Sequence, residues 1–268
     1  MRRTVKTTWI LAGAGFRRHS TYRLAIVAGL TTNSVFGLIR ASILLAALAS
    51  AGTTISGYSA GEASSFVWWS QGLIASVNLF QWNDVAVRVR SGDIAVDFSR
   101  PIDPQLAFLA SDLGRAALHF LARGLPSILI GALTFGIALP RSPWLWPLGL
   151  LSTLLAVLIS FGCRYAVNVT SFWWVENRGP QLVYLVVSGF LCGLYLPVHW
   201  FPHWLQTLAH ATPFPSMLQS PIDLLSGRAS LGDAVPLLLT QATWALAVLA
   251  LGQVLTRLGR RRLELQGG

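Results

Sequence analysis

Few residues in this chain have the type and spacing that catalysis requires. A nucleotide-binding loop needs glycines followed by Lys-Ser or Lys-Thr, because backbone amides surround the phosphates while the lysine reaches the terminal ones. The chain has a single lysine, Lys6; Thr7 and Thr8 follow it, but no glycine precedes it. The sequence therefore predicts that this polypeptide does not hydrolyse ATP itself, so any energy comes from a partner or an ion gradient.

The histidines offer a second candidate chemistry. His199 and His203 are four residues apart and His210 follows closely, which raises the idea of a metal site. No carboxylate or cysteine completes the set, so we favour histidines at a membrane interface. Nothing else in the pattern of residues suggests a protease or another hydrolase, so we expect no catalytic residue, no metal and no other cofactor in this chain.

Two ionisable residues remain, each near a long apolar run. Arg40 falls in a stretch that otherwise reads as a membrane span, where a charge is costly unless it is paired or faces a cavity. Arg40 either lines a translocation path or pairs with Glu62 at the start of the next run; alternatively, the span is shifted and Arg40 reaches the membrane surface. Arg40 and Glu62 are therefore the candidates for a translocation path.

The composition explains why so few residues are reactive. The chain is 53% hydrophobic and 11% charged, whereas soluble domains carry about 25% charged residues. A membrane-spanning helix needs about 20 mostly apolar residues, and such runs lie at 24–49, 61–82, 115–139, 144–166, 173–198 and 234–256. These runs are too long for barrel strands. The sequence predicts an all-α integral membrane protein with six transmembrane helices, in which Cys163 and Cys192 are buried small hydrophobes.

The arginines and the one lysine predict how the chain is oriented. The net charge of +10 does not indicate nucleic-acid binding, because the basic residues lie at helix ends and in particular loops. Lys and Arg number six through Arg23, five in 83–123 and four from Arg257 onward, against one each in 139–144 and 199–233. Because basic loops stay on the cytoplasmic side, we expect both termini and the 83–123 region to be cytoplasmic.

Three segments outside the spans have distinct patterns. Residues 1–22 place an apolar stripe opposite basic side chains, as a helix in the membrane plane would; the alternative is a disordered basic tail. The 83–114 segment begins with alternating valines that indicate a short strand, whereas Asp103 and Pro104 predict the start of a helix that enters the third span. The 199–233 segment is rich in proline and aromatic residues and predicts short helices that dip into the outer leaflet.

Several short motifs resemble one family, the ABC-2-type permeases. The chain shares the entry to the second span, a segment of the first long cytoplasmic loop, a proline-rich external region and a terminal sequence; these are Gly57-Tyr58-Ser59 through Glu62, Ser91-Gly92-Asp93 with Arg100-Pro101, Leu196-Pro197 with Phe201-Pro202, Pro213-Phe214, Pro221-Ile222 and Gly227, and Leu265-Gln266-Gly267-Gly268. Phe98-Ser99 replaces the usual leucines, and Arg40 stands where the family more often has an aromatic residue.

This resemblance implies a single permease domain over 1–268, in the bacterial cytoplasmic (plasma) membrane. It implies an elbow helix at 1–22, a cytoplasmic coupling region at 83–114 and an external re-entrant region at 199–233. The expected partners are an ATP-binding cassette ATPase dimer, which holds the ATP and Mg, and a second permease subunit that is more often different than identical.

The implied function is export of an amphiphilic or lipophilic substrate, with the ATPase pushing on the coupling region. Arg88, Arg90, Asp93, Arg100 and Asp103 are the candidates for that contact; alternatively, these arginines only bind lipid headgroups. An ion-coupled transporter would need carboxylates inside the spans, and only Glu62 and Glu176 come close. A membrane scaffold that transports nothing is the third alternative.

Overall fold

The computed structural model describes residues 2–52, 54, 56–80, 82–174 and 176–263. Helices make up 80% of the structure, and no strand occurs in the described residues. The prediction of an all-helical protein is therefore confirmed. The terminal motif at 265–268 lies outside the described residues.

The helices differ widely in length, from single turns to more than nine turns. Short 3-10 turns η2, η3 and η4 (Thr170–Phe172, Val198–Trp200 and Pro215–Met217) join the longer elements. These elements are α1 Arg2–Ser20, α2 Arg23–Ala51, α3 Ala60–Val77, α4 Asp84–Ser91, α5 Ile94–Ser99, α6 Pro104–His119, the π-helix η1 Phe120–Gly124, α7 Leu125–Thr134, α8 Leu145–Val169, α9 Arg178–Leu191, α10 His203–His210, α11 Gln219–Leu225 and α12 Leu231–Leu263.

Within the described residues, four helical stretches are long and apolar enough to cross a membrane: Arg23–Ser50, Pro104–Thr134, Leu145–Phe172 and Leu231–Arg262. The other two predicted spans, 61–82 and 173–198, do not reach this standard. The helix α9 has 14 residues, about 21 Å, because Gly193 adopts a positive φ of 85° just beyond its end. Gly189 and Gly193 match the GxxxG pattern of closely packed helices, but Gly193 lies beyond the end of α9, so the two glycines do not share a helix face.

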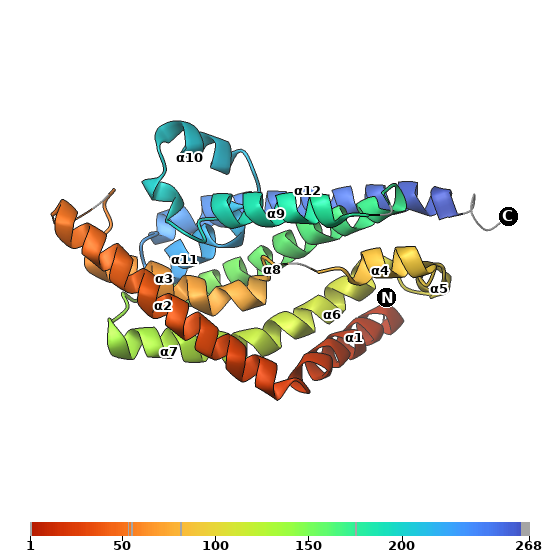
Figure 1. The fold of residues 1–268 in the computed structure, drawn as a ribbon, viewed down its shortest axis with the longest axis horizontal. Helices are drawn as coiled ribbons and strands as arrows, with labels where there is room; N and C mark the ends of the chain where they lie inside the picture. Colours follow the sequence, from red (N-terminus) through yellow and green to blue (C-terminus); the bar gives the residue numbers. More distant parts are fainter. Residues whose placement is uncertain (1, 53, 55, 81, 175, 264–268) are drawn as a thin grey trace.

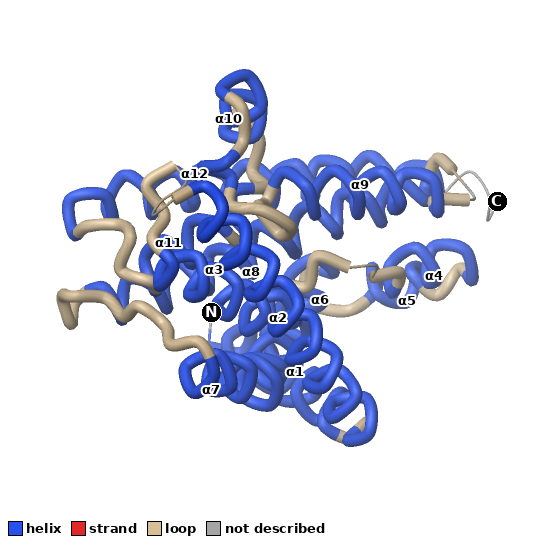
Figure 2. Tube along the Cα trace, turned by 60° about the vertical axis from the view of Figure 1, so that its left-hand side comes forward, coloured by secondary structure: helices blue, strands red, loops and turns tan. Residues whose placement is uncertain are grey.

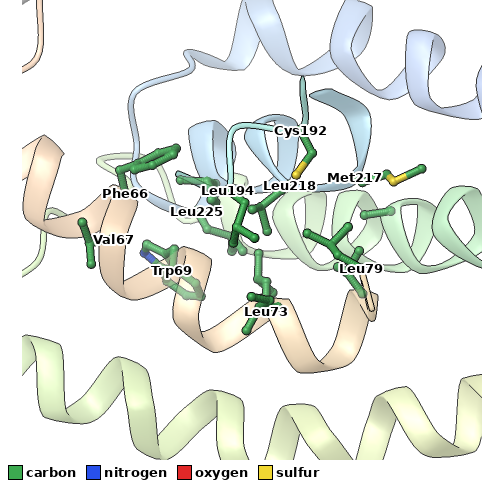
Figure 3. Close-up of a cluster of buried hydrophobic side chains, with 14 of the residues drawn as sticks. Phe66, Val67, Trp69, Leu73, Leu79, Cys192, Leu194, Met217, Leu218 and Leu225 are labelled. Carbon is green, nitrogen blue, oxygen red and sulfur yellow. The ribbon is translucent and has the colours of Figure 1, made fainter. Parts of the chain in front are cut away.

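The other predicted span that is not among the four membrane-length helices is α3. It has 18 residues but contains several serines and Gln71. Most of its length is buried, including Phe66, Trp68 and Leu73. Figure 3 shows its side chains gathered with Leu218 and Leu225 from the segment before α12. Because α3 faces protein on nearly every side, its composition is that of a protein core rather than a lipid-facing helix.

The helices run between two ends of an elongated bundle. Figure 1 shows α4, α5, the start of α1 and the end of α12 at one end, and α10, α11 and the end of α7 at the other. We call these the α4/α5 end and the α10/α11 end. In Figure 2, α10 projects from the bundle while α4 and α5 form a small lobe of their own.

Residues 2–20 form the helix α1, rather than a disordered tail, and α1 packs along α6. Contact is close because Gly15 faces the backbone of Ser111, and Gly114 faces the backbone of Ala12, with no room for a Cβ at either glycine. The predicted apolar stripe borders a groove of about 670 Å³ between α1 and α6; from α1 it includes Val5, Trp9, Ala12, Gly13 and Phe16.

The prediction of a short strand at the start of 83–114 is wrong, because these residues form α4. Its charges suit a helix: Asp84 lies in the first turn, Arg88 and Arg90 lie in the last, and Gly92 closes it with a φ of 81°. The prediction for Asp103 is confirmed. Its side chain accepts a hydrogen bond from the Leu106 N–H at 3.0 Å, Pro104 follows it, and α6 continues into a membrane-length helix.

The 199–233 segment consists of short helices, as predicted, and its two main helices differ in burial. Every residue of α11 is buried, whereas α10 buries only Ala209. Tyr58, which precedes α3, contacts this segment through its ring against Trp200 and through its hydroxyl, which accepts a hydrogen bond from Gln219 at 3.2 Å. The segment is therefore anchored to the start of α3.

Candidate functional site

The α4/α5 lobe is held together by one buried carboxylate. Asp97 is 7% exposed; its Oδ2 accepts a hydrogen bond from Arg88 at 2.8 Å, and its Oδ1 lies 3.3 Å from Arg100 Nη1 in an ion pair. The Arg88 guanidinium also lies 5.9 Å from the centre of the Phe108 ring on α6. Arg88 and Arg100 thus have structural partners, which the sequence pattern did not reveal.

The outer surface of this lobe carries apolar and basic side chains together. Val87 and Val96 are 51% and 54% exposed, and Arg90 and Asp93 are also exposed. Asp93 accepts a hydrogen bond from the hydroxyl of Ser91 at 2.8 Å. Arg90 has no ion pair with any residue that the structure describes. We call Val87, Arg90 and Val96 the lobe tip.

Asp103 is placed differently from the other four predicted coupling residues. Besides capping α6, it accepts a hydrogen bond from Gln253 of α12 at 2.8 Å. Both interactions belong to the packing of the bundle. The structure therefore brings Arg88, Asp93 and Arg100 together in the lobe with Arg90, and places Asp103 at the base of α6.

Asn168 near the end of α8 connects the lobe to the bundle. Its Oδ1 accepts from the Ala86 N–H at 3.4 Å, while its Nδ2 donates to the carbonyl oxygens of Trp82 and, at 2.9 Å, Arg164. Val85 of α4 is 1% exposed and packs in one cluster with residues of α8. A displacement of α4 would therefore be transmitted directly to α8.

A second contact joins the lobe to α1. Arg18 Nη1 lies 3.2 Å from Asp84 Oδ2. Between α1, the lobe and α6 lies a cavity of about 430 Å³, lined by both acidic and basic side chains that include Arg18, Asp84, Arg88, Asp93, Asp97 and Arg100. The lobe thus contacts both α1 and the spans.

Deeper in the bundle lies a buried charged cluster that the sequence analysis did not single out: Asp112, Arg115 and Arg164. Asp112 Oδ1 accepts from Arg115 Nε at 2.6 Å, and Asp112 Oδ2 accepts from Arg164 Nη2 at 2.9 Å. Arg115 also donates to the carbonyl oxygens of Ala75 at 2.7 Å and Ser76 at 2.8 Å. The charged cluster therefore fastens α6 and α8 to the last turn of α3.

The sequence does contain a signal for this cluster, since Arg115, Arg123 and Arg164 fall within long apolar runs. The basic 83–123 region, which predicts the membrane orientation, includes Arg115 and Arg123, but all three arginines lie within membrane-length helices. Arg123 lies in the π-helix η1 and donates to Asn33 of α2 at 3.3 Å. A π-helix often marks a functional position in a helix.

Arg40 and Glu62, the two path candidates, have different partners. Arg40 donates to the Ser70 hydroxyl at 3.2 Å and to the Tyr195 carbonyl at 3.3 Å. Glu62 forms a capping box with Ser59 and lies 3.8 Å from Arg228. The structure therefore does not pair Arg40 with Glu62, and it places Glu62 at the α10/α11 end.

The α10/α11 end contains a polar network around Tyr58. The Arg228 guanidinium lies 3.9 Å from the centre of the Tyr58 ring, and His199 Nε2 lies 3.1 Å from Asp223 Oδ2. Burial, together with the nearby Asp223 carboxylate, raises the pKa of Tyr58 well above its ordinary value. His199 thus has a carboxylate partner that the spacing of the histidines did not reveal.

The comparisons with known proteins agree with this architecture. A family model described as ABC-2 family transporter protein matches residues 36–267, which include the lobe, the charged cluster and both ends of the bundle, but not α1. No curated protein and no solved structure matches the chain. With four membrane-length helices, the chain is an integral membrane protein, and it belongs to the ABC-2 family of transporter permeases.

Proposed function

We propose that this chain is the transmembrane permease subunit of an ATP-driven bacterial ABC exporter, powered by a separate ATP-binding cassette ATPase dimer. The observation that supports this best is the α4/α5 lobe. It presents exposed apolar and basic side chains at its tip, yet its inner side is bonded to α8 through Asn168. A partner that moved the lobe would move a span.

In the proposed mechanism, the ATPase contacts the lobe tip, and Arg88, Asp93 and Arg100 keep the lobe rigid. ATP binding and hydrolysis on the partner displace α4, and Asn168 passes this displacement to α8. The charged cluster then carries it to α3 and α6, so that the helices rock as a unit and alternate the access of the substrate site.

The substrate is proposed to be an amphiphilic or lipophilic compound, such as a drug, an antibiotic or a lipid-like molecule. Arg40 remains a candidate for the path, since its partners are a serine hydroxyl and a carbonyl rather than a carboxylate. Glu62 would lie near the outer exit. The groove between α1 and α6 offers an apolar surface that suits such compounds.

The assembly is proposed to contain a second permease, with the two termini and the lobe in the cytoplasm of the producing bacterium. The start of α1, the lobe and the end of α12 share one end of the bundle, which supports a common side. In this arrangement α1 is the elbow helix, and α10 and α11 form the external re-entrant region. The helices α3 and α9 would complete six passages through the membrane.

The proposal is tested by ATP-dependent transport in proteoliposomes that contain the chain with its co-purified ATPase. We expect ATP to drive substrate accumulation that a proton or sodium ionophore does not abolish. Transport that ionophores abolish, and that continues without ATP, would instead assign the chain to the ion-coupled transporters.

One observation bears on that second candidate. Asp112 is a buried carboxylate inside a span, as an ion-coupled transporter requires. It is bonded to two arginines, however, at 2.6 Å and 2.9 Å. A carboxylate held in this way is poorly suited to take up and release a proton, which favours the ATP-driven function.

A further inference from the structure

The charged cluster contains two buried cations but only one carboxylate. Asp112 and Arg164 are 4% and 2% exposed, and Arg115 is 6% exposed. Burying a charge within a membrane protein is costly unless a counter-charge or a full set of hydrogen bonds compensates it. The cluster therefore carries an excess positive charge that its own side chains do not neutralise.

The hydrogen bonds of the two arginines show which one lacks a partner. Arg115 is supplied with acceptors, because Asp112 and two carbonyl oxygens at the negative end of α3 surround it. Arg164 donates through Nη2 to Asp112 and through Nε to the Ser160 hydroxyl at 3.3 Å. Its Nη1 is buried and has no hydrogen-bond partner.

Arg164 also lines a small cavity between α8, α9 and the segment that follows α3. Gln181 and Tyr184 of α9 also line it, with Phe80 and Trp82 on the third side. The Tyr184 hydroxyl is buried next to Ser160 but makes no hydrogen bond of good geometry, and Gln181 is 6% exposed. The cavity measures about 10 Å³, which is room for one water-sized particle.

We propose that this cavity is a binding site for a small monatomic anion such as chloride, held by Arg164, Tyr184 and Gln181. The guanidinium, the phenol and the amide all offer N–H or O–H donors, so an acceptor satisfies them together. An anion also cancels the excess charge of the cluster, whereas a water molecule does not. The site is independent of what the permease transports.

The position of the site gives it a consequence for assembly of the fold. α9 has 14 residues and packs mainly against α8. An anion bonded to Arg164 on α8 and to Tyr184 on α9 would fasten these two helices together. Occupancy of the site should therefore appear as increased stability of the whole chain.

The test uses the full chain in detergent and measures thermal unfolding by tryptophan fluorescence, with chloride titrated against gluconate at constant ionic strength. Gluconate is too large for the cavity. Substitution of Arg164 risks misfolding, so the informative variant is Tyr184→Phe, with Tyr195→Phe as the control because the Tyr195 side chain is 58% exposed. An unbonded buried hydroxyl costs stability, so Tyr184→Phe should be tolerated in gluconate.

We expect chloride to raise the melting temperature of the wild type and of Tyr195→Phe along the same saturable curve. Tyr184→Phe should need roughly 10-fold to 100-fold more chloride for half of the effect, as expected for the loss of a hydrogen bond to a charged group. Equal melting temperatures in the two salts would overturn the proposal. The same would follow if Tyr184→Phe and the wild type responded identically to chloride.

Discussion

Asn168 accepts a hydrogen bond from the backbone N–H of Ala86 at 3.4 Å, which joins the end of α8 to the short helix α4. The same side chain donates to the Trp82 carbonyl, so it bonds the chain on both sides of the start of α4. Asn168 is only 2% exposed. Because of these two hydrogen bonds, α4 is attached to the span α8, and a displacement of α4 would move α8 with it.

The first prediction concerns this attachment. Asn168→Leu removes the acceptor of Ala86 and the donor to Trp82, so about 1–3 kcal/mol of stability should be lost from the junction. ATP hydrolysis by the assembled complex should continue while transport per ATP hydrolysed falls severalfold. Asn83→Ala is the matched control, because the Asn83 side chain makes no capping bond to α4. Equal transport per ATP in the wild type and Asn168→Leu would contradict the role of Asn168.

The second prediction separates docking from folding in the lobe. Arg90→Glu should weaken co-purification of the ATPase without changing the melting temperature, because Arg90 is exposed and lacks an ion pair within the described structure. Arg88→Glu should reduce both the co-purification of the ATPase and the melting temperature, since Arg88 also pairs with the buried Asp97. The measurements are the ratio of ATPase to permease after purification and the thermal unfolding curve. If Arg90→Glu retained the full amount of ATPase, the lobe tip would not be the docking surface.

The third prediction concerns the charged cluster. Asp112→Asn leaves two buried guanidinium groups without a carboxylate, and removing one partner of a buried ion pair costs about 3–5 kcal/mol. Asp84→Asn breaks the ion pair between Arg18 and Asp84, whose side chains are 65% and 40% exposed respectively. This change should cost about 0–1 kcal/mol of stability. Thermal unfolding in detergent measures both. Similar losses for the two variants would show that the buried cluster does not hold the bundle together.

The fourth prediction concerns the contact between α1 and α6. A Cβ at Gly15 would collide with the backbone of Ser111, whereas a Cβ at Gly13 would have Arg17 Nη1 as its nearest neighbour, at 3.9 Å. Gly15→Ala should therefore destabilise the chain by about 1–3 kcal/mol and expose Arg17 and Arg18 to trypsin. Gly13→Ala should be neutral or slightly stabilising. The contact would be dispensable if both variants resisted trypsin equally.

The sequence predicted those parts of the fold that depend on local patterns. Long apolar runs identified the membrane-length helices, and Asp103 with Pro104 identified the start of α6. The prediction from sequence failed at α4, where alternating valines suggested a strand. Three valines at every second position, with two arginines between and after them, fit both a strand and a helix when the segment is only eight residues long.

The charged cluster was missed for a different reason. Asp112 and Arg115 lie three residues apart near the start of a span, a position where charges usually mark the membrane surface. Their partner Arg164 is 52 residues from Asp112 in sequence, and no local pattern relates the two. Only the packing of α6 against α8 and α3 shows that they form one buried unit.

The most direct test of the central claim is cross-linking from within the membrane of the producing cell. A photoactivatable amino acid is placed at Val96 in the α4/α5 lobe or at Trp204 in α10, which are 54% and 68% exposed. We predict that an ATP-binding cassette ATPase is cross-linked from Val96 and not from Trp204. Cross-linking of such an ATPase from Trp204, or from neither position, would contradict the assignment of the lobe as the coupling region of an ABC permease.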